Sequence, residues 1–243
     1  MLIHLDVKSL ELVTAAYLSR DEVLIAEITQ GVDIHQNNKE RFKLPERRIA
    51  KIFVFRLIYG GQAYSYAHDT DFNYISKSID HWQQIIDDFY KKYPQIAKWH
   101  ENLVSKVLDT GQLVIPTRRV YSFPRDEVAA NLWFWRPKIL NYPVQGLGAD
   151  LVAIGRVSLW RRLQKSGLRN KVLFISTVHD SIDLDVLDTS MDLVYNVCRI
   201  AKESIMDIPR NFERLFKVPF DLPVGSEIGY GPSLGELKIY NNE

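Results

Sequence analysis

Four side chains recur at every fourth position of the segment "RRIAKIFVFRLIYGG", and they are two cations followed by two aromatic rings. They are Arg47, Lys51, Phe55 and Tyr59. Residues four apart lie on nearly the same face of an α-helix, about 6 Å apart along its axis, so this line spans roughly 18 Å. A nucleoside triphosphate has a similar length, with phosphates at one end and a flat base at the other. Any one of the four is better explained as a core or solvated residue, but four in register favour a nucleotide-binding helix.

Two aspartates stand where strands are expected to end. Asp6 closes "LIHLDV", and Asp180 lies between the two halves of "KVLFISTVHDSIDLDVL". Each alone is typical of a turn aspartate. Together, two carboxylates at strand ends are suited to hold two Mg²⁺ ions, which activate an attacking hydroxyl and neutralise a leaving triphosphate. The pair predicts a two-metal phosphoryl-transfer site.

The elements that position these residues follow from periodicity. Pro45 and Gly60-Gly61 bound a helix over residues 45–60. Residues 2–7 predict a strand, and residues 171–187 predict a hairpin with Asp180 at its tip. Other segments predict helices over 9–19, 144–164 and 189–206, a strand, turn and strand over 112–123, and a closing strand after residue 218. Strands near both chain ends with helices between them indicate an α+β protein with a helical insertion.

Composition narrows the class of protein. The 243 residues carry 31 basic and 30 acidic side chains, so a nucleic-acid role requires a local basic surface. The single cysteine, Cys198, excludes an internal disulfide and a multi-cysteine zinc site. No apolar run has membrane-spanning length, and no signal peptide is recognised. We expect an intracellular, cytoplasmic protein with no membrane contact.

The segments above resemble the motifs of family A DNA polymerases, in the right order and over nearly the whole chain. "RRIAKIFVFRLIYG" resembles motif B, the fingers helix with the pattern R-x-x-x-K-x-x-x-F/Y-x-x-x-Y-G. "LDVKSLELVTAAYLSRD" resembles motif A, and "VHDSIDLDV" resembles motif C. The resemblance implies a polymerase that adds dNMP units to a primer 3′-hydroxyl with two Mg²⁺ ions, on primer–template DNA and with dNTPs as substrates.

The resemblance also implies a role for each matching residue. Asp6, Asp180 and the backbone carbonyl of Val7 would be the metal ligands. Arg47 and Lys51 would contact the triphosphate, with Lys51 also catalytic, and His35 of "DIHQNN" would lie nearby. Phe55 would meet the sugar and base, Tyr59 would lie on the template side, and Glu11 would exclude a ribose 2′-hydroxyl and pair with the Tyr59 hydroxyl. Asn141 and Gln145 of "NYPVQGLGAD", with His179, would contact the DNA near the primer terminus.

Three departures from the family pattern stand out. Ser181 replaces the usual glutamate of motif C, and His-Asp-Ser also occurs in single-subunit RNA polymerases. Val54 and Arg56 replace the Asn and Gly that usually flank the motif B aromatic. The family pattern has an arginine four residues before the asparagine that Asn141 matches. Pro137 occupies that position in this chain, and Arg136 is left as a substitute in a shifted register.

The resemblance further implies a right-hand architecture with an antiparallel palm sheet and helical fingers. Its expected domains are palm over 1–35, fingers over 36–135 and palm again over 136–243. In the family a thumb precedes motif A, so we expect a right hand lacking the thumb. Either the chain is a fragment of a longer polymerase, or it is one product of a split polymerase and a second polypeptide carrying the thumb, with or without a 3′–5′ exonuclease domain, would complete it. Met1 favours a split gene of viral or phage origin, and the partner is expected to cover an exposed apolar surface near residues 1–5.

Three alternatives to a DNA polymerase remain open, and sequence features weigh against each of them. One is a non-catalytic interaction subunit with a polymerase-like fold, which the intact set Asp6, Asp180, Arg47 and Lys51 disfavours. Another is an enzyme like the single-subunit RNA polymerases, which Glu11 and Phe55 disfavour. A two-metal nuclease would leave the helix over 45–60 without a purpose.

Overall fold

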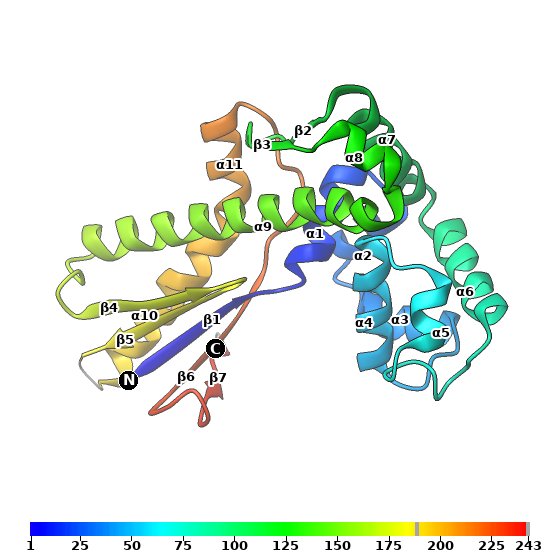
Figure 1. The fold of residues 1–243 in the computed structure, drawn as a ribbon. Coiled ribbons are helices and arrows are strands. Elements are labelled where there is room, and N and C mark those ends of the chain that lie inside the picture. Colours follow the sequence, from blue (N-terminus) through cyan, green and yellow to red (C-terminus); the bar gives the residue numbers. More distant parts are fainter. Residues whose placement is uncertain (188–189, 242–243) are drawn as a thin grey trace. The chain divides into compact units, whose positions relative to one another are not determined.

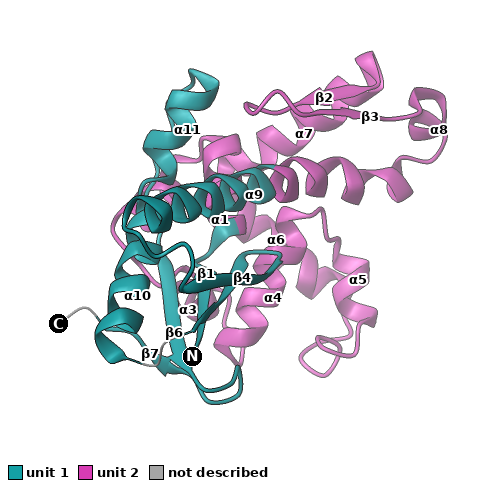
Figure 2. Cartoon of the chain, turned by 90° about the vertical axis from the view of Figure 1, so that its left-hand side faces the viewer, with its two compact units in different colours: residues 1–10, 147–243 teal, residues 11–146 magenta. Residues whose placement is uncertain are grey.

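The structure is a computed structural model that describes residues 1–187 and 190–241. The chain forms two compact units, coloured separately in Figure 2. Unit 1 contains residues 1–10 and 147–243, and unit 2 contains residues 11–146. The long helix α9 (Leu132–Lys165) contributes residues to both units. These boundaries lie away from those expected at residues 35 and 135, and the assignment of palm and fingers to them stays a prediction.

Unit 1 is built on a five-stranded antiparallel sheet whose strands come from both ends of the chain. Its order is β4-β5-β1-β6-β7 (Figure 1). The strands are β1 (Leu2–Val7), β4 (Val172–Val178), β5 (Ser181–Val186), β6 (Ser226–Gly231) and β7 (Lys238–Ile239). The strand over residues 2–7 and the hairpin over 171–187 are therefore confirmed.

Strand β1 lies in the middle of this sheet and not at an exposed surface. It pairs with β5 on one side and β6 on the other. Ile3 and Leu5 are fully buried, because alternate side chains of a strand point to opposite faces and this set faces the core. The expected exposed apolar surface near residues 1–5 is thus wrong: the two neighbouring strands and the apolar core already cover it.

Helices complete the apolar core of unit 1. They are α10 (Met191–Met206) and α11 (Ile208–Phe216), together with the second half of α9. Helix α10 contacts β1 and β6, and its Val194, Val197 and Ala201 are buried. Gly155 of α9 lies so close to Ile205 that a Cβ there would be 2.7 Å from its Cδ1. The helix expected over 189–206 is observed from Met191, and residue 189 lies outside the described residues.

Unit 2 is mainly helical. Its helices are α1 (Leu10–Ser19), α2 (Glu22–Thr29), α3 (Ile34–Arg41), α4 (Arg47–Ile58), α5 (Ala63–His68), α6 (Ile79–Lys92), α7 (Pro94–Thr110) and α8 (Arg125–Ala130), with the first half of α9. Strands β2 (Gln112–Val114) and β3 (Val120–Ser122) form a separate hairpin. This confirms the strand, turn and strand expected over 112–123.

An aromatic core fixes the orientation of α4. Phe53 is fully buried and lies 4.9 Å from the Tyr66 ring and 6.0 Å from the Trp82 ring, between ring centroids. Ile49 and Leu57, four residues to either side, are buried on the same face. With this face in the core, Arg47 and Lys51 on another side of the helix are left exposed. Among the described residues no helix is both long and apolar enough to cross a membrane.

Candidate active site

Asp6 and Asp180 come together in unit 1 at the same end of neighbouring strands. Asp6 pairs with Ser181 in the β1–β5 register, and Asp180 directly precedes Ser181. The Val7 amide donates to the Asp180 carbonyl at 3.0 Å, which ties the end of β1 to the hairpin tip. The fold therefore places two aspartates from opposite ends of the chain at adjacent backbone positions.

The hairpin tip has a tight geometry. His179 adopts a left-handed backbone with φ 52° in the turn between β4 and β5, and its side chain is exposed. Ser181 is buried, and its hydroxyl donates to the Val178 carbonyl at 2.9 Å. The residue that replaces the expected glutamate thus closes the turn and adds no third carboxylate.

The donor set of this edge fits Mg²⁺. Mg²⁺ is usually held by one or two carboxylates, and waters and substrate phosphates complete its octahedron. Asp6 and Asp180 supply two hard oxygen donors at adjacent positions. Glu227 faces Asp6 in the β1–β6 register, and it lies 3.7 Å from the Lys8 ammonium. No cluster of three acidic, His or Cys side chains suited to a metal exists in the described part of the chain.

A polar network on the same sheet was missed from the sequence. His4 Nδ1 lies 2.7 Å from an Asp183 carboxylate oxygen, and the Ser176 hydroxyl donates to the other oxygen of Asp183. His4 and Asp6 alternate with buried Ile3 and Leu5, so they share one face of β1. The alternation in "LIHLDV" and "SIDLDV" was the available signal, because it puts polar side chains on one face of both strands.

The line of side chains on α4 lies in unit 2 with histidine and aspartate partners from α3. Arg47 Nε donates to an Asp33 carboxylate oxygen at 2.8 Å, and both groups are about half exposed. Lys51 Nζ lies 5.5 Å from the Phe55 ring centroid. Exposed ion pairs contribute only about 0–1 kcal/mol, so an incoming phosphate can compete for Arg47. Asp33, the N-cap of α3, was not anticipated from the sequence.

His35 is buried beside these two cations. Its ring meets the edge of Phe55 at 5.4 Å between centroids, and its Nδ1 has no hydrogen-bond partner within the described ranges. Burial, and then the charges of Arg47 and Lys51, lower the pKa of His35 to about 4. The imidazole is therefore neutral at physiological pH. The structure groups His35, Arg47, Lys51 and Phe55, as the sequence predicts.

At the end of α4, Tyr59 is joined to two other predicted residues of unit 2. Gln145 Nε2 donates to the Tyr59 hydroxyl oxygen at 2.6 Å. Burial raises the pKa of Tyr59 well above its usual value, and the negative charge of Glu11 adds to this, so the hydroxyl stays protonated. Gly60 follows with φ 83°, and a Cβ there would be 2.8 Å from Leu140 of α9. Glycine is needed for this helix end on both grounds.

The structure shows what surrounds Arg56 and Arg136, two residues at which the chain departs from the family pattern. Arg56 donates to Asp69 at 2.8 Å, and its guanidinium lies 4.8 Å from the Phe72 ring centroid, so it fastens the loop after α5. Arg136 lies five residues before Asn141 on α9, about 140° around the helix from it. Arg136 instead acts electrostatically on Tyr90 and His100. Asn141 has a buried Oδ1 with no partner among the described residues.

Comparisons with known proteins agree on one family. The family model described as DNA polymerase family A matches residues 1–236. DNA polymerase I of Chloroflexus aurantiacus is 28% identical over 96% of this chain, and the DNA polymerase of Bacillus phage SP01 is 26% identical over 97%. A solved structure, the POL domain of Pol1 from M. smegmatis in complex with DNA primer-template and dNTP, covers 96% of the chain with a TM-score of 0.78 at 21% identity.

The chain is much shorter than these relatives. It spans 24% of the Chloroflexus protein, 26% of the phage protein and 39% of the M. smegmatis chain.

Proposed function

Because the chain belongs to DNA polymerase family A, we propose that it performs template-directed DNA synthesis. In this reaction the 3′-hydroxyl of a primer attacks the α-phosphate of a dNTP, a phosphodiester bond forms and pyrophosphate leaves. The observation that carries the proposal is the placement of Asp6 and Asp180 at the same end of adjacent strands.

Asp6, Asp180 and the backbone carbonyl of Val7 would hold two Mg²⁺ ions. When bound, the ions supply a lowered pKa for the primer hydroxyl and charge neutralisation for the triphosphate. Asp6 comes from the central strand of the sheet, and Asp180 comes from the short turn between β4 and β5, which the Val7–Asp180 hydrogen bond ties to the end of β1. Such a fixed placement is what a site needs when the reacting oxygen and phosphorus must be held at a fixed separation.

The residues of unit 2 would bind the incoming nucleotide. Arg47 and Lys51 would hold the triphosphate, and Lys51 would also stabilise the charge that develops on the leaving group. Neutral His35 packs against Phe55, where it adds a buried imidazole without adding a third positive charge. Phe55 would face the sugar and base of the nucleotide.

Selection against ribonucleotides would rest on Glu11 and Tyr59. Glu11 lies in the first turn of α1 and acts on the Tyr59 hydroxyl, which Gln145 also contacts. A carboxylate held at the sugar would occupy the space of a ribose 2′-hydroxyl. Asn141, Gln145 and His179 would contact the DNA, using minor-groove acceptors that all bases share.

Ser181 supports a second candidate, an enzyme like the single-subunit RNA polymerases. Ser181 turns its hydroxyl to the Val178 carbonyl and leaves motif C with one carboxylate. Incorporation of rNTPs in preference to dNTPs by the unaltered chain would favour this candidate. Preference for dNTPs would favour DNA synthesis.

We also propose that a second polypeptide carrying a thumb, with or without a 3′–5′ exonuclease domain, completes the enzyme. Support comes from the relatives, of which this chain spans about a quarter. Most sequence-independent affinity for DNA comes from phosphate contacts, so the chain alone should extend primers distributively and lose activity at modest salt. Primer extension with Mg²⁺ and dNTPs tests the proposed activity, and processive, salt-resistant extension by the chain alone would contradict the need for a partner.

A further inference from the structure

Unit 1 contains a basic groove that the proposed catalytic residues do not use. It has a volume of about 760 Å³ and is lined by α9 and α11, with the end of α10. Five lining side chains are cationic (Arg161, Arg162, Lys165, Arg210 and Arg214), and two are anionic (Asp150 and Asp207). The whole chain has a net charge of only +1, so this is a local concentration of positive charge.

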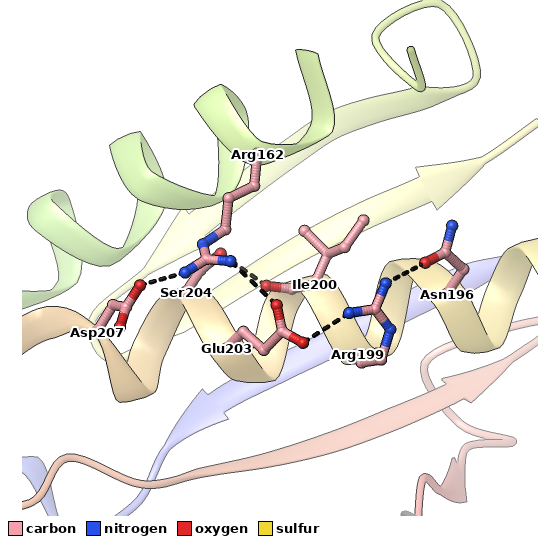
Figure 3. Close-up of polar contacts among 7 residues, drawn as sticks. All are labelled: Arg162, Asn196, Arg199, Ile200, Glu203, Ser204 and Asp207. Atoms are coloured by element: carbon pink, nitrogen blue, oxygen red, sulfur yellow. Dashed lines mark hydrogen bonds and ion pairs between the residues drawn. The ribbon is translucent and has the colours of Figure 1, made fainter. Parts of the chain in front are cut away.

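One of the five cations is neutralised within the protein. Arg162 donates to Glu203 at 3.0 Å and also pairs with Asp207, and Glu203 in turn pairs with Arg199 at 2.6 Å (Figure 3). This network links α9 to α10. Arg162 is therefore a structural residue, and its pairing removes Asp207 as a counter-charge for the remaining cations of the groove.

The other four cations are exposed and lack acidic partners. Arg161, Lys165 and Arg210 form no hydrogen bond or ion pair within residues 1–187 and 190–241, and Arg214 contacts only the neutral amide oxygen of Asn211, at 3.2 Å. Arg161 and Lys165 are four residues apart on α9, as are Arg210 and Arg214 on α11. Like charges at this spacing destabilise a helix slightly. The two helices thus face one groove with two self-repelling pairs.

We propose that this groove binds the phosphate backbone of DNA, as an anchoring site separate from Asp6 and Asp180. Cations four residues apart on a helix are separated by about 6.0 Å of rise, which is close to the through-space separation of neighbouring phosphates on one DNA strand, because each step combines a rise of about 3.4 Å with a turn around the duplex. Each pair can therefore meet two phosphates of one strand. Arginine, which supplies three of the four free cations, matches phosphate oxygens with two parallel donors.

This inference rests on the proposed function, because DNA is the polyanion that a polymerase must hold. It adds a DNA-binding surface within the chain itself, whose four free cations on α9 and α11 match no family motif position. The prediction concerns affinity and its salt dependence and not the chemical step.

The test measures the binding of fluorescein-labelled mixed-sequence DNA, as duplex and as single strand, by anisotropy over a series of salt concentrations. The variants are Arg210→Gln/Arg214→Gln and Arg161→Gln/Lys165→Gln. Each lost phosphate contact lowers the slope of log K against log salt by about 0.9 for duplex and about 0.7 for single strand. Each double variant should therefore lose about 1.8 or about 1.4 from the slope, and duplex binding at 0.15 M salt should weaken roughly thirtyfold. A loss on either DNA supports the proposal, and the DNA with the larger loss is the one that the groove holds.

Two control variants distinguish the loss of DNA contacts in the groove from the effect of a lower net charge on DNA binding. Lys98→Gln/Lys106→Gln removes two exposed cations from α7, so it makes the same change in net charge. Arg210→Lys/Arg214→Lys keeps the charge of the groove and should keep the wild-type slope. Equal slope changes in the α7 and groove variants, or no change in the groove variants, would overturn the proposal. Primer extension by the wild-type chain tests the proposed function independently, because it requires Asp6 and Asp180 and not the groove cations.

Discussion

Gln145 on α9 donates a 2.6 Å hydrogen bond to the hydroxyl of Tyr59, the residue that ends α4. The bond joins a residue of the expected DNA-contacting segment to the last residue of the nucleotide-binding line. A residue proposed to contact DNA and a residue proposed to contact the nucleotide therefore share one hydrogen bond inside unit 2, so a change at either residue should alter the other.

A double-mutant cycle of Tyr59→Phe and Gln145→Leu should reveal this coupling. Each single change removes the same bond, so the two losses of unfolding free energy should not add, and the coupling should be about 0.5 to 1 kcal/mol. Urea unfolding of the four proteins measures it. Additive losses would mean that the bond contributes nothing to stability.

Glu11→Ala should relax discrimination against ribonucleotides. The change opens the space where a 2′-hydroxyl would lie and removes the charge that acts on Tyr59. The measurement is the efficiency of rNTP incorporation divided by that of dNTP incorporation, which should rise by an order of magnitude or more, roughly the discrimination that 1.4 kcal/mol provides. Glu22→Ala, in the first turn of α2, is the matched control and should leave the ratio at the wild-type value. An unchanged ratio in Glu11→Ala would show that Glu11 is not the gate.

Stability should fall as pH falls from about 6.5 towards 5, because His35 and His100 are held neutral in the folded chain. Their folded pKa values are lowered to about 4 and about 3, chiefly by burial, whereas an unfolded histidine titrates near 6.5. The unfolded chain therefore binds more protons in this window, and unfolding becomes easier as pH falls. Each histidine contributes up to about 2 kcal/mol at pH 5.

The variant His35→Gln should lose about half of this pH dependence. Urea midpoints at pH 6.5 and pH 5 measure the effect. The charged groups that face His35 are Arg47, Lys51 and Asp33. The variant leaves all three in place, so the comparison isolates the imidazole. An identical pH dependence in wild type and His35→Gln would contradict the burial of a neutral imidazole at this position.

Arg56→Ala should loosen the loop that follows α5. Arg56 pairs with Asp69 and with Asp71 and lies over Phe72, and all three contacts disappear on truncation. Because Arg56 and Asp69 are each about one-third exposed, the expected loss of unfolding free energy is only about 1 kcal/mol. Limited proteolysis should show faster cleavage between residues 69 and 75. Arg48→Ala, an exposed arginine of the same helix, is the control, and equal cleavage rates in the two variants would rule out the clamp.

Residue patterns were sufficient to predict several elements. Apolar runs and alternation predicted β1 and the β4–β5 hairpin, and the four-residue spacing between Pro45 and Gly60 predicted α4. The patterns failed at α9, which was expected over 144–164 but begins at Leu132. Pro137 and Pro143 lie inside this helix, and proline usually ends a helix, so the sequence hid its first half.

Contacts between distant segments were beyond sequence reasoning. The pairing of Asp33 with Arg47 and of His4 with Asp183 depends on which elements pack together, and short-range patterns do not encode that. The expected apolar surface at residues 1–5 failed for the same reason. Ile3 and Leu5 are covered by strands and helices from the other end of the chain.

The most direct test of the central claim is Mg²⁺-dependent primer extension by Asp180→Asn beside wild type. The change keeps the size of the side chain and removes one of the two paired carboxylate charges, so single-nucleotide addition should fall by at least about a thousandfold, with an unchanged urea midpoint. Asp185→Asn, on the same hairpin but paired with the N-terminus, should extend primers as wild type does. Extension by Asp180→Asn at the wild-type rate would contradict the account.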